Sequence, residues 1–253
     1  MDDTASTLAL GEALRDDDID TRRYAAEALG EIHDERAIDP LVRSLRDGDP
    51  QVRRAAARAL GRLQSNQATS GLTVALLDDF AEVRRAAVGA LAEIRDVSAA
   101  EPLLATLRDR DREVRAASAR ALGSLKSPAA VDGLIALLGD DQADVRKTAA
   151  WSLGQIGDQR ATPRLATALR DDDRDVRRSV VTALAQLRDS TAVPALRTAL
   201  ADEDRIVRHG AIRALATIRT VSALEALRAV TDTTDVEIQR TIDRALGRNR
   251  VRL

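Results

Sequence analysis

The sequence predicts an all-α protein, an α-solenoid in the form of a right-handed superhelix of eight helix pairs. Two series of leucines carry this prediction, because each returns every 31 residues along the 253-residue chain. The first series is Leu10, Leu41, Leu72, Leu103, Leu134, Leu165, Leu196 and Leu227, and the second is Leu29, Leu60, Leu91, Leu122, Leu153, Leu184, Leu215 and Leu246. No segment shows the alternating apolar pattern of a strand.

A period of this length indicates stacked units that are each too small to bury their own apolar face. No linker rich in proline, glycine or serine interrupts the period, so we expect a single domain over residues 1–253. The repeats lie at about residues 4–33, 34–64, 65–95, 96–126, 127–157, 158–188, 189–219 and 220–248.

Each repeat begins with a predicted helix, seen in residues 37–47, where Ile38, Leu41 and Leu45 recur at helical spacing. An alanine heads this helix in seven copies, at Ala37, Ala68, Ala99, Ala130, Ala161, Ala192 and Ala223. Only a small residue lets successive helices approach closely, so we expect these alanines at helix contacts. The pattern predicts two long helices in each repeat.

The second helix of the repeat follows a short acidic turn. Asp49 is a suitable N-cap, and Pro50 suits the first helical position, where the missing N–H costs nothing. The helix that starts there carries Val52, Ala56 and Leu60 on one apolar stripe.

A glycine recurs near the end of the second helix. It stands at Gly30, Gly61, Gly123, Gly154 and Gly247, while Ala92, Ala185 and Ala216 take its place in the other copies. Glycine inside a helix costs about 1 kcal/mol relative to alanine. Its recurrence therefore predicts that a neighbouring helix packs against bare backbone at this position.

These motifs resemble a known family. Leu45-Arg46-Asp47, Asp49, Val52-Arg53-Arg54 and Ala59-Leu60-Gly61 are similar to the HEAT-like repeats named after the phycobilisome (PBS) lyases, and the resemblance covers residues 4–248. It implies the α-solenoid fold. It does not fix a function, because the family includes bilin-lyase subunits, a di-iron deoxyhypusine hydroxylase, scaffolds and adaptors.

The second helices carry a first arginine series, whose members are Arg22, Arg53, Arg84, Arg115, Arg146, Arg177 and Arg208. The resemblance implies that each member ties down the inter-helix aspartate of an adjoining turn, which is a structural role. Gln239 replaces the arginine in the last copy, as expected for a terminal repeat that lacks a neighbour on one side.

A second series lies one residue further along and is turned by about 100° around the helix. It reads Arg23, Arg54, Arg85, Ala116, Lys147, Arg178, His209 and Arg240, and we expect it on the concave side. With neighbours one turn on, it gives a candidate partner-binding surface of Tyr24, Glu27, Arg54, Arg58, Arg85, Arg120, Lys147, Trp151, Arg178, His209, Arg213, Arg240 and Arg244. Such a strip suits one extended acidic partner. The alternative for each single residue is a solvated polar face.

Trp151 is expected on the surface, because the equivalent positions in the other repeats hold polar or small residues. An exposed tryptophan in the middle of a solenoid suits an interface anchor, the alternative being an incidental surface residue. His209 is interpreted as a variant of the basic series, with a titrating role as the alternative.

Enzymatic chemistry finds little support in the composition. The chain has no cysteine, and its two histidines, His33 and His209, cannot supply the repeated His-Glu iron ligands of the hydroxylase branch. No phosphate-cradling glycine loop and no pairing of nucleophile and base occurs. We therefore expect no catalytic residue, no cofactor and no metal site.

The leading hypothesis is a non-enzymatic, cytoplasmic scaffold or adaptor that binds an acidic segment of a protein on its concave face. No segment approaches the about 20 apolar residues of a membrane span, so no membrane partner is expected. One alternative is binding of a nucleic-acid backbone through the same arginines, against which stand the aspartate-rich turns and a pI of about 5.8. Another is a bilin-lyase-like or chaperone subunit that acts on a tetrapyrrole protein.

Overall fold

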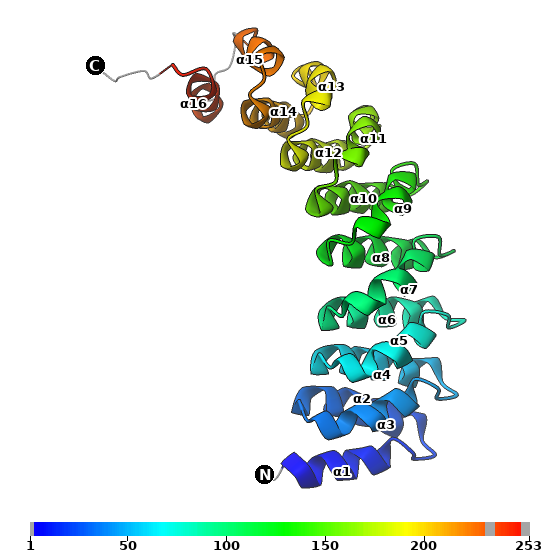
Figure 1. The fold of residues 1–253 in the computed structure, drawn as a ribbon. Coiled ribbons are helices and arrows are strands. Elements are labelled where there is room, and N and C mark those ends of the chain that lie inside the picture. The colour runs from blue at the N-terminus through cyan, green and yellow to red at the C-terminus, as the bar shows by residue number, and fades with distance from the viewer. Residues whose placement is uncertain (1–2, 231–235, 249–253) are drawn as a thin grey trace. The chain divides into compact units, whose positions relative to one another are not determined.

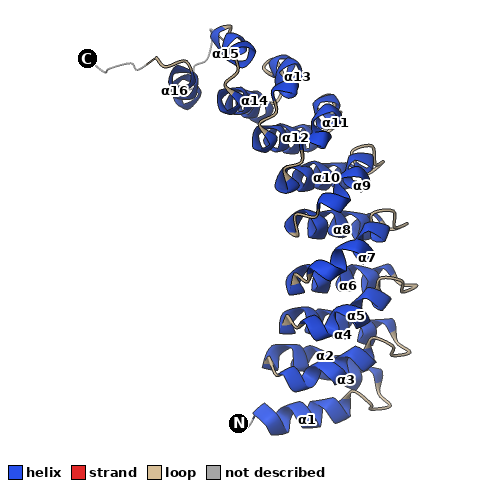
Figure 2. Ribbon diagram, in the orientation of Figure 1, coloured by secondary structure: helices blue, strands red, loops and turns tan. Residues whose placement is uncertain are grey.

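The computed structural model describes residues 3–230 and 236–248, and within these ranges the regular structure is helical, without a strand (Figures 1 and 2). Contacts divide the chain into two compact units, residues 1–129 and 130–253. The single domain over residues 1–253 stays a prediction, and residues 1–2, 231–235 and 249–253 of that range lie outside the described residues.

The first unit holds four helix pairs in which the second helices stack in order, α2 on α4, α4 on α6 and α6 on α8 (Figure 1). Each first helix packs on the second helix of its own pair. The α-helices are α1 Asp3–Ala13, α2 Ile19–Ile32, α3 Ile38–Ser44, α4 Pro50–Leu63, α5 Thr69–Ala75, α6 Ala81–Ile94, α7 Ala100–Thr106 and α8 Arg112–Ser124, and the 3-10 turns are η1 Glu35–Ala37, η2 Asn66–Ala68 and η3 Val97–Ala99.

The second unit repeats this plan, with α10, α12, α14 and α16 stacked in order. Its α-helices are α9 Val131–Leu137, α10 Ala143–Ile156, α11 Thr162–Ala168, α12 Arg174–Leu187, α13 Val193–Ala199, α14 Arg205–Ile218, α15 Val221–Arg228 and α16 Val236–Ala245. The 3-10 turns η5 Gln159–Ala161 and η6 Ser190–Ala192 precede α11 and α13, and η4 Pro128–Ala130 precedes α9.

The sixteen described α-helices confirm the predicted α-solenoid of eight pairs. The leucines of both series are buried in every copy except the two outermost, Leu10 and Leu246, which are half-buried. The alanines that head the first helices are fully buried in all seven copies. The right-handed curvature of the whole chain stays a prediction.

The recurring glycines divide into two kinds. At Gly30, Gly61 and Gly154 an added Cβ would lie 2.8–2.9 Å from the Cα of an alanine on the next second helix, which confirms the predicted close packing. For Gly247 the packing explanation is wrong. This glycine follows the end of α16 with a φ of +69°, and a Cβ there would meet nothing within 4 Å. It ends the helix, because the left-handed conformation suits glycine.

The prediction of a long first helix is wrong. In the second repeat, α3 has seven residues and follows the 3-10 turn η1 of three residues. The side chain of Asp34 accepts a hydrogen bond from the amide of Arg36, which fixes the tighter turn at the start. Beyond α3 the amides of Arg46 and Asp47 bond to carbonyls three residues back. The segment is helical throughout, but only its middle is α-helix.

The predicted N-cap of the second helix is confirmed in the second repeat. The side chain of Asp49 accepts from the amides of Gln51 and Val52, and Pro50 occupies the first turn. Aspartates cap α2, α8, α12 and α14 in the same way. Phe80 and Gln142 hold this position before α6 and α10 without a side-chain cap.

Candidate functional site

Within each unit, arginines of the first series join one repeat to the next. Arg84 Nε donates to Asp109 Oδ2 at 2.7 Å, and Arg84 Nη2 donates to Asp109 Oδ1 at 2.7 Å. The third nitrogen, Nη1, donates to the carbonyls of Asp78 and Asp79 in its own repeat, at 2.8 and 3.1 Å. The same arrangement joins Arg22 to Asp47, Arg53 to Asp78, Arg146 to Asp171 and Arg177 to Asp202. These arginines hold the stack together, as the resemblance implies.

Each of these aspartates also shapes its own turn. The other partner of Asp109 is the amide of Asp111, which donates to Asp109 Oδ1 at 2.8 Å. Burial raises the pKa of Asp109, but the hydrogen bonds from Arg84 and from this amide outweigh it, so the pKa lies below its ordinary value. Asp47, Asp78 and Asp171 show the same lowered pKa for the same causes. The carboxylates are ionised at neutral pH.

In the first unit, Arg23 and Arg85 of the second series already have partners. Arg23 pairs with Asp20 at 2.8 Å, and its guanidinium carbon lies 4.2 Å from the ring centroid of Tyr24. The Tyr24 side chain is exposed. Arg85 forms an ion pair with Glu113 in the first turn of α8. These pairings reduce the positive charge that the face offers to a partner.

The second unit shows stronger pairing of the same kind. Arg178 Nε and Nη2 donate to both oxygens of Asp204, the N-cap of α14, at 3.0 and 2.5 Å. The hydrogen bond from Arg178 lowers the pKa of Asp204. Lys147 pairs with Asp144 at 2.9 Å, one turn earlier on α10. The sequence predicts that Arg178 and Lys147 bind a partner, but both are already paired with aspartates of their own unit.

His209 and Trp151 lie on the second helices α14 and α10. Arg205 Nε donates to His209 Nε2 at 3.4 Å, across one turn of α14. The Trp151 side chain is 39% exposed, which confirms that it is not part of the core. On the same face of α10, Lys147 stands one turn earlier and the half-buried Gln155 stands one turn later.

The remaining arginines of the candidate surface make no hydrogen bond or ion pair through their side chains with any described residue. Five of them are exposed, and Arg54 is half-buried. They are Arg54 and Arg58 on α4, Arg120 on α8, Arg213 on α14, and Arg240 and Arg244 on α16.

Two of these arginines meet in a groove of about 390 Å³ between α4 and α6, which we call the arginine groove. Its lining residues are Arg54, Arg58, Arg62, Glu82, Arg85, Ala86, Gly89, Ala90 and Glu93. The structure thus brings together Arg54, Arg58 and Arg85 of the predicted surface. The sequence reasoning missed Arg62, although its place two turns after Arg54 on the same helix face was a visible signal.

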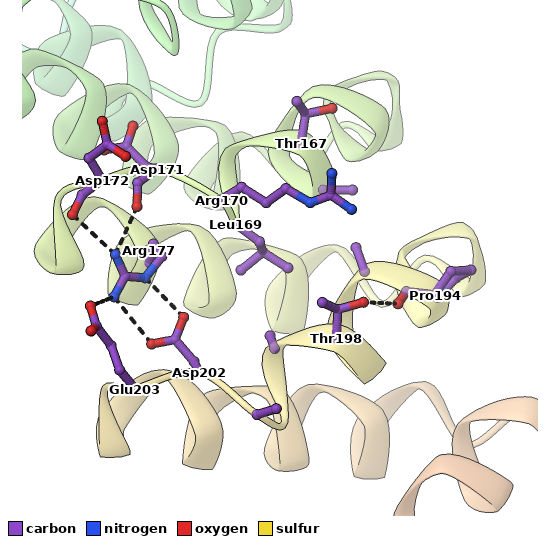
Figure 3. Close-up of a pocket in the computed structure, with 14 residues that line it drawn as sticks. Thr167, Leu169, Arg170, Asp171, Asp172, Arg177, Pro194, Thr198, Asp202 and Glu203 are labelled. Carbon is purple, nitrogen blue, oxygen red and sulfur yellow. Dashed lines mark hydrogen bonds and ion pairs between the residues drawn. The ribbon is translucent and has the colours of Figure 1, made fainter.

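A larger hollow of about 890 Å³ lies on the side of the first helices, between α11 and α13 (Figure 3). Its main polar side chains bond within the protein. Arg177 donates to the carbonyls of Asp171 and Asp172 and to the carboxylates of Asp202 and Glu203. The hydroxyls of Thr167 and Thr198 donate to the backbone carbonyls of Pro163 and Pro194, one turn earlier on the same helices. Arg170 also lines the hollow, and its exposed side chain makes no hydrogen bond or ion pair with any described residue.

Among the described helices, none combines the length and the apolar character that crossing a membrane requires. Within the same residues, no three histidine, cysteine, aspartate or glutamate side chains are grouped so as to hold a metal ion.

Three known structures of similar fold align with almost the whole of this chain. The YibA protein of Escherichia coli aligns with a TM-score of 0.67 at 22% identity over 97% of this chain and 95% of YibA. An engineered protein aligns at 0.65 and 26% identity, over 96% of this chain and 78% of that protein. The complex of CpcE and CpcF of the phycocyanin lyase from Nostoc aligns at 0.55 and 23% identity, over 95% and 94%.

No curated protein matches the sequence. The sequence profile of HEAT repeats matches residues 7–92, 69–144, 100–181 and 162–247, which together span nearly all of the chain. With the stacked helix pairs, the buried leucine series and the arginine–aspartate ties already described, the chain belongs to the family of HEAT-repeat proteins.

Proposed function

We propose that this HEAT-repeat protein is a non-enzymatic scaffold that binds an acidic segment of a partner protein on the face formed by its second helices. The observation that carries the proposal is the contrast between two kinds of arginine on the same helix. Arg53 makes four hydrogen bonds within the protein, whereas Arg54 and Arg58 make none with any described residue. The terminal nitrogens of Arg54 and the exposed guanidinium of Arg58 are therefore available to a partner.

Charge complementarity supports this choice of partner. Guanidinium groups bind carboxylates with paired, charge-assisted hydrogen bonds, and a cluster of them speeds association with an acidic surface. The exposed aromatic side chains of Tyr24 and Trp151 lie on the same second-helix faces of their units. Aromatic residues and arginine are the types most enriched at the energetic centres of protein interfaces.

The proposal is tested by fluorescence anisotropy with a labelled twelve-residue peptide of alternating glutamate and alanine. We expect the wild-type chain to bind this peptide and to ignore the matching lysine–alanine peptide. The variant with Arg54→Glu and Arg58→Glu removes two positive charges from the face and adds two negative ones, so binding is expected to be lost while helicity is kept.

A matched variant controls for net charge. Arg43 and Arg46 are exposed arginines of the first-helix side, outside the candidate surface. Reversal of both to glutamate changes the net charge equally, and we expect peptide binding to persist apart from a small long-range effect. Equal loss of binding in both double variants, or no binding by the wild type, contradicts the scaffold proposal.

The alternative functions stay predictions and are separated by two further arms of the same assay. A twelve-base-pair DNA duplex that binds more tightly than the acidic peptide, with an affinity that falls steeply with salt, favours nucleic-acid binding. The fold similarity to the CpcE–CpcF complex prompts the second arm, in which a free bilin is added and its absorbance spectrum is followed. A spectral change that depends on the protein favours the lyase-like subunit.

A further inference from the structure

Gly89 is a mid-helix glycine with no packing contact to explain it. Glycine is among the least favourable residues inside a helix, so it is normally kept there for close packing or for function. At Gly61, on the preceding second helix, an added Cβ would lie 2.9 Å from the Cα of Ala90. At Gly89 an added Cβ would meet no heavy atom within 4 Å. The helix α6 therefore has no steric need for glycine at this position.

The missing side chain opens the arginine groove beside Arg58. Gly89 follows Arg58 by one repeat of 31 residues, so the two residues hold equivalent positions on the adjacent helices α4 and α6, and both line the groove. The equivalent position elsewhere holds a residue with a side chain, namely Glu27, Arg120, Trp151, Thr182, Arg213 or Arg244. Glycine here lets another chain approach the backbone of α6 closely.

A second observation in the same groove points to a ligand with acceptor oxygens. The Nε atom of Arg54 is buried, and no acceptor of the described chain bonds to it. A buried donor without an acceptor is costly, because it has lost its contact with bulk water. Because the Nε atom itself is covered, a ligand oxygen would reach Arg54 through the terminal nitrogens of its guanidinium, which also have no partner among the described residues.

The other charged residues of the groove restrict the charged group of the ligand to a single small anion. Arg62 and Arg85 are paired with Glu31 and Glu113, neither of which lines the groove. Glu82 and Glu93 stand eleven residues apart on α6, about 16 Å along the helix, with Gly89 between them. A nucleic-acid duplex carries one charge per about 1.7 Å of its axis, so its phosphates would meet one or both glutamates. A single carboxylate avoids them.

We infer that the arginine groove receives one aspartate or glutamate side chain of a partner protein, with its carboxylate bonded by Arg54 and Arg58 and its backbone lying over Gly89. The inference rests on the proposed scaffold function and names the chemical group that the scaffold recognises in its first unit. The guanidinium donors supply the affinity for the carboxylate, and the gap at Gly89 supplies the room for the chain that carries it.

The test uses a capped pentapeptide, Ala-Gly-Glu-Gly-Ala, titrated into the full chain while the arginine Nε–Hε signals are followed by NMR. We expect saturable shifts of the Arg54 and Arg58 signals. The same peptide with glutamine in place of glutamate, and inorganic phosphate, are expected to give weaker shifts without saturation. If the glutamine peptide or phosphate shifts these signals as strongly as the glutamate peptide, the assignment to a carboxylate side chain is wrong.

Two variants probe the site itself. Arg58→Ala removes a hydrogen-bond donor to the carboxylate. Gly89→Leu places a side chain in the gap, at a position where an added Cβ meets no heavy atom within 4 Å. Each variant is therefore expected to weaken pentapeptide binding by about tenfold or more. Arg43→Ala and Thr182→Leu are the matched controls, the second because Thr182 holds the position of Gly89 on α12. Both controls are expected to bind like the wild type.

The outcomes separate this inference from the scaffold proposal. Gly89→Leu is checked for folding by circular dichroism and thermal unfolding, and we expect it to be at least as stable as the wild type. Unchanged pentapeptide binding by a folded Gly89→Leu overturns the inference. If the twelve-residue acidic peptide binds through Arg54 and Arg58 but the pentapeptide gives no saturable shift, the groove inference fails while the scaffold function stands. If neither peptide binds, both fail.

Discussion

Arg53 on α4 and Asp78 before α6 form a two-point ion pair between neighbouring repeats, with Nε–Oδ2 and Nη2–Oδ1 distances of 2.6 and 3.1 Å. Arg53 also donates to the carbonyls of Asp47 and Gly48 in its own turn, at 2.8 and 3.2 Å. One guanidinium therefore fixes the turn of its own repeat and the turn of the next. Both side chains of the pair are nearly buried, at 13% and 11% exposure.

We expect Arg84→Ala to destabilise the fold by about 3 kcal/mol. The substitution leaves Asp109 without its charged partner while its side chain is only 9% exposed, and an uncompensated buried charge is costly. Urea unfolding followed by circular dichroism measures the change. Arg58→Ala serves as the control, since Arg58 is exposed and unpaired with any described residue, and we expect a change within about 0.5 kcal/mol. Similar losses in both variants would contradict the structural role.

Stability is expected to fall in acid. The pKa values of Asp47, Asp78, Asp109 and Asp171 are lowered in the folded state, so the stability from these carboxylates is fully present above the unfolded pKa of about 3.9. It is lost as the pH falls through the lower folded values. Urea midpoints measured from pH 6 downward are expected to drop below about pH 4.

Asp109→Asn isolates one of these carboxylates. The amide keeps the shape of the side chain but carries no charge, so we expect the variant to be less stable than the wild type at neutral pH. Because the amide does not titrate, we expect the free energy of unfolding to depend less on pH than in the wild type. An unchanged slope of stability against pH in this variant would exclude Asp109 as a source of the acid sensitivity.

Two glycines of adjacent helices are expected to respond to alanine with opposite signs. Gly61→Ala places a Cβ 2.9 Å from the Cα of Ala90, and overpacking of this kind costs about 1–3 kcal/mol. Gly89→Ala meets no heavy atom and gains helix propensity, so it is expected to stabilise by up to about 1 kcal/mol. Thermal unfolding of the two variants decides the matter, and a destabilised Gly89→Ala would mean that α6 has a structural need for this glycine.

The residue after α6 offers a stabilising change of the backbone. Arg95 ends that helix in the left-handed region with a φ of +57°, where a side chain is strained. Arg95→Gly is expected to raise the free energy of unfolding by about 0.5–1 kcal/mol. Gly157 holds the same position after α10 with a φ of +79°, so Gly157→Ala is expected to lower stability by a similar amount. The same sign of change in both variants would refute this account.

Trp151→Ala tests the second unit. If Trp151 anchors a partner, its loss is expected to weaken binding by about 1 kcal/mol or more, mainly through faster dissociation, with little change in stability. Stopped-flow measurement of the dissociation rate checks this. Trp151 is the single tryptophan of the chain, so its fluorescence in the wild type reports directly whether a bound partner covers it.

The core could be predicted from the sequence because one period fixes it. Leu41 and Leu60 are fully buried where the 31-residue register puts them, and Ala37 is fully buried at the head of its helix. The length of the first helix could not be predicted, because apolar spacing is alike in α-helix and in 3-10 turns over so few residues. The place of Gly247 in the repeat pattern predicts packing, yet an added Cβ there meets nothing within 4 Å, and the φ of +69° shows that this glycine serves the end of the helix.

The candidate surface could be predicted only in outline. Periodicity tells which side of a helix a residue occupies, and it placed Arg54, Arg58 and Trp151 outside the core. It does not tell whether a charge is already neutralised, because that depends on a side chain about one repeat away. Arg178 meets Asp204, twenty-six residues on, and this pairing follows from the packing of α12 against α14.

In five repeats an arginine is tied to the aspartate 25 residues later, and this fixed spacing makes 31 residues the natural unit by which the chain can be lengthened or shortened. Excision of residues 65–95 would place Arg53 twenty-five positions before Asp109, so the shortened protein would recover the same ion pair at the new junction. Tandem duplication of residues 65–95 likewise returns Arg53 and both copies of Arg84 to an aspartate 25 residues later. A chain built in this way can change its length by whole repeats, while an insertion of any other size within a repeat breaks the tie that spans it.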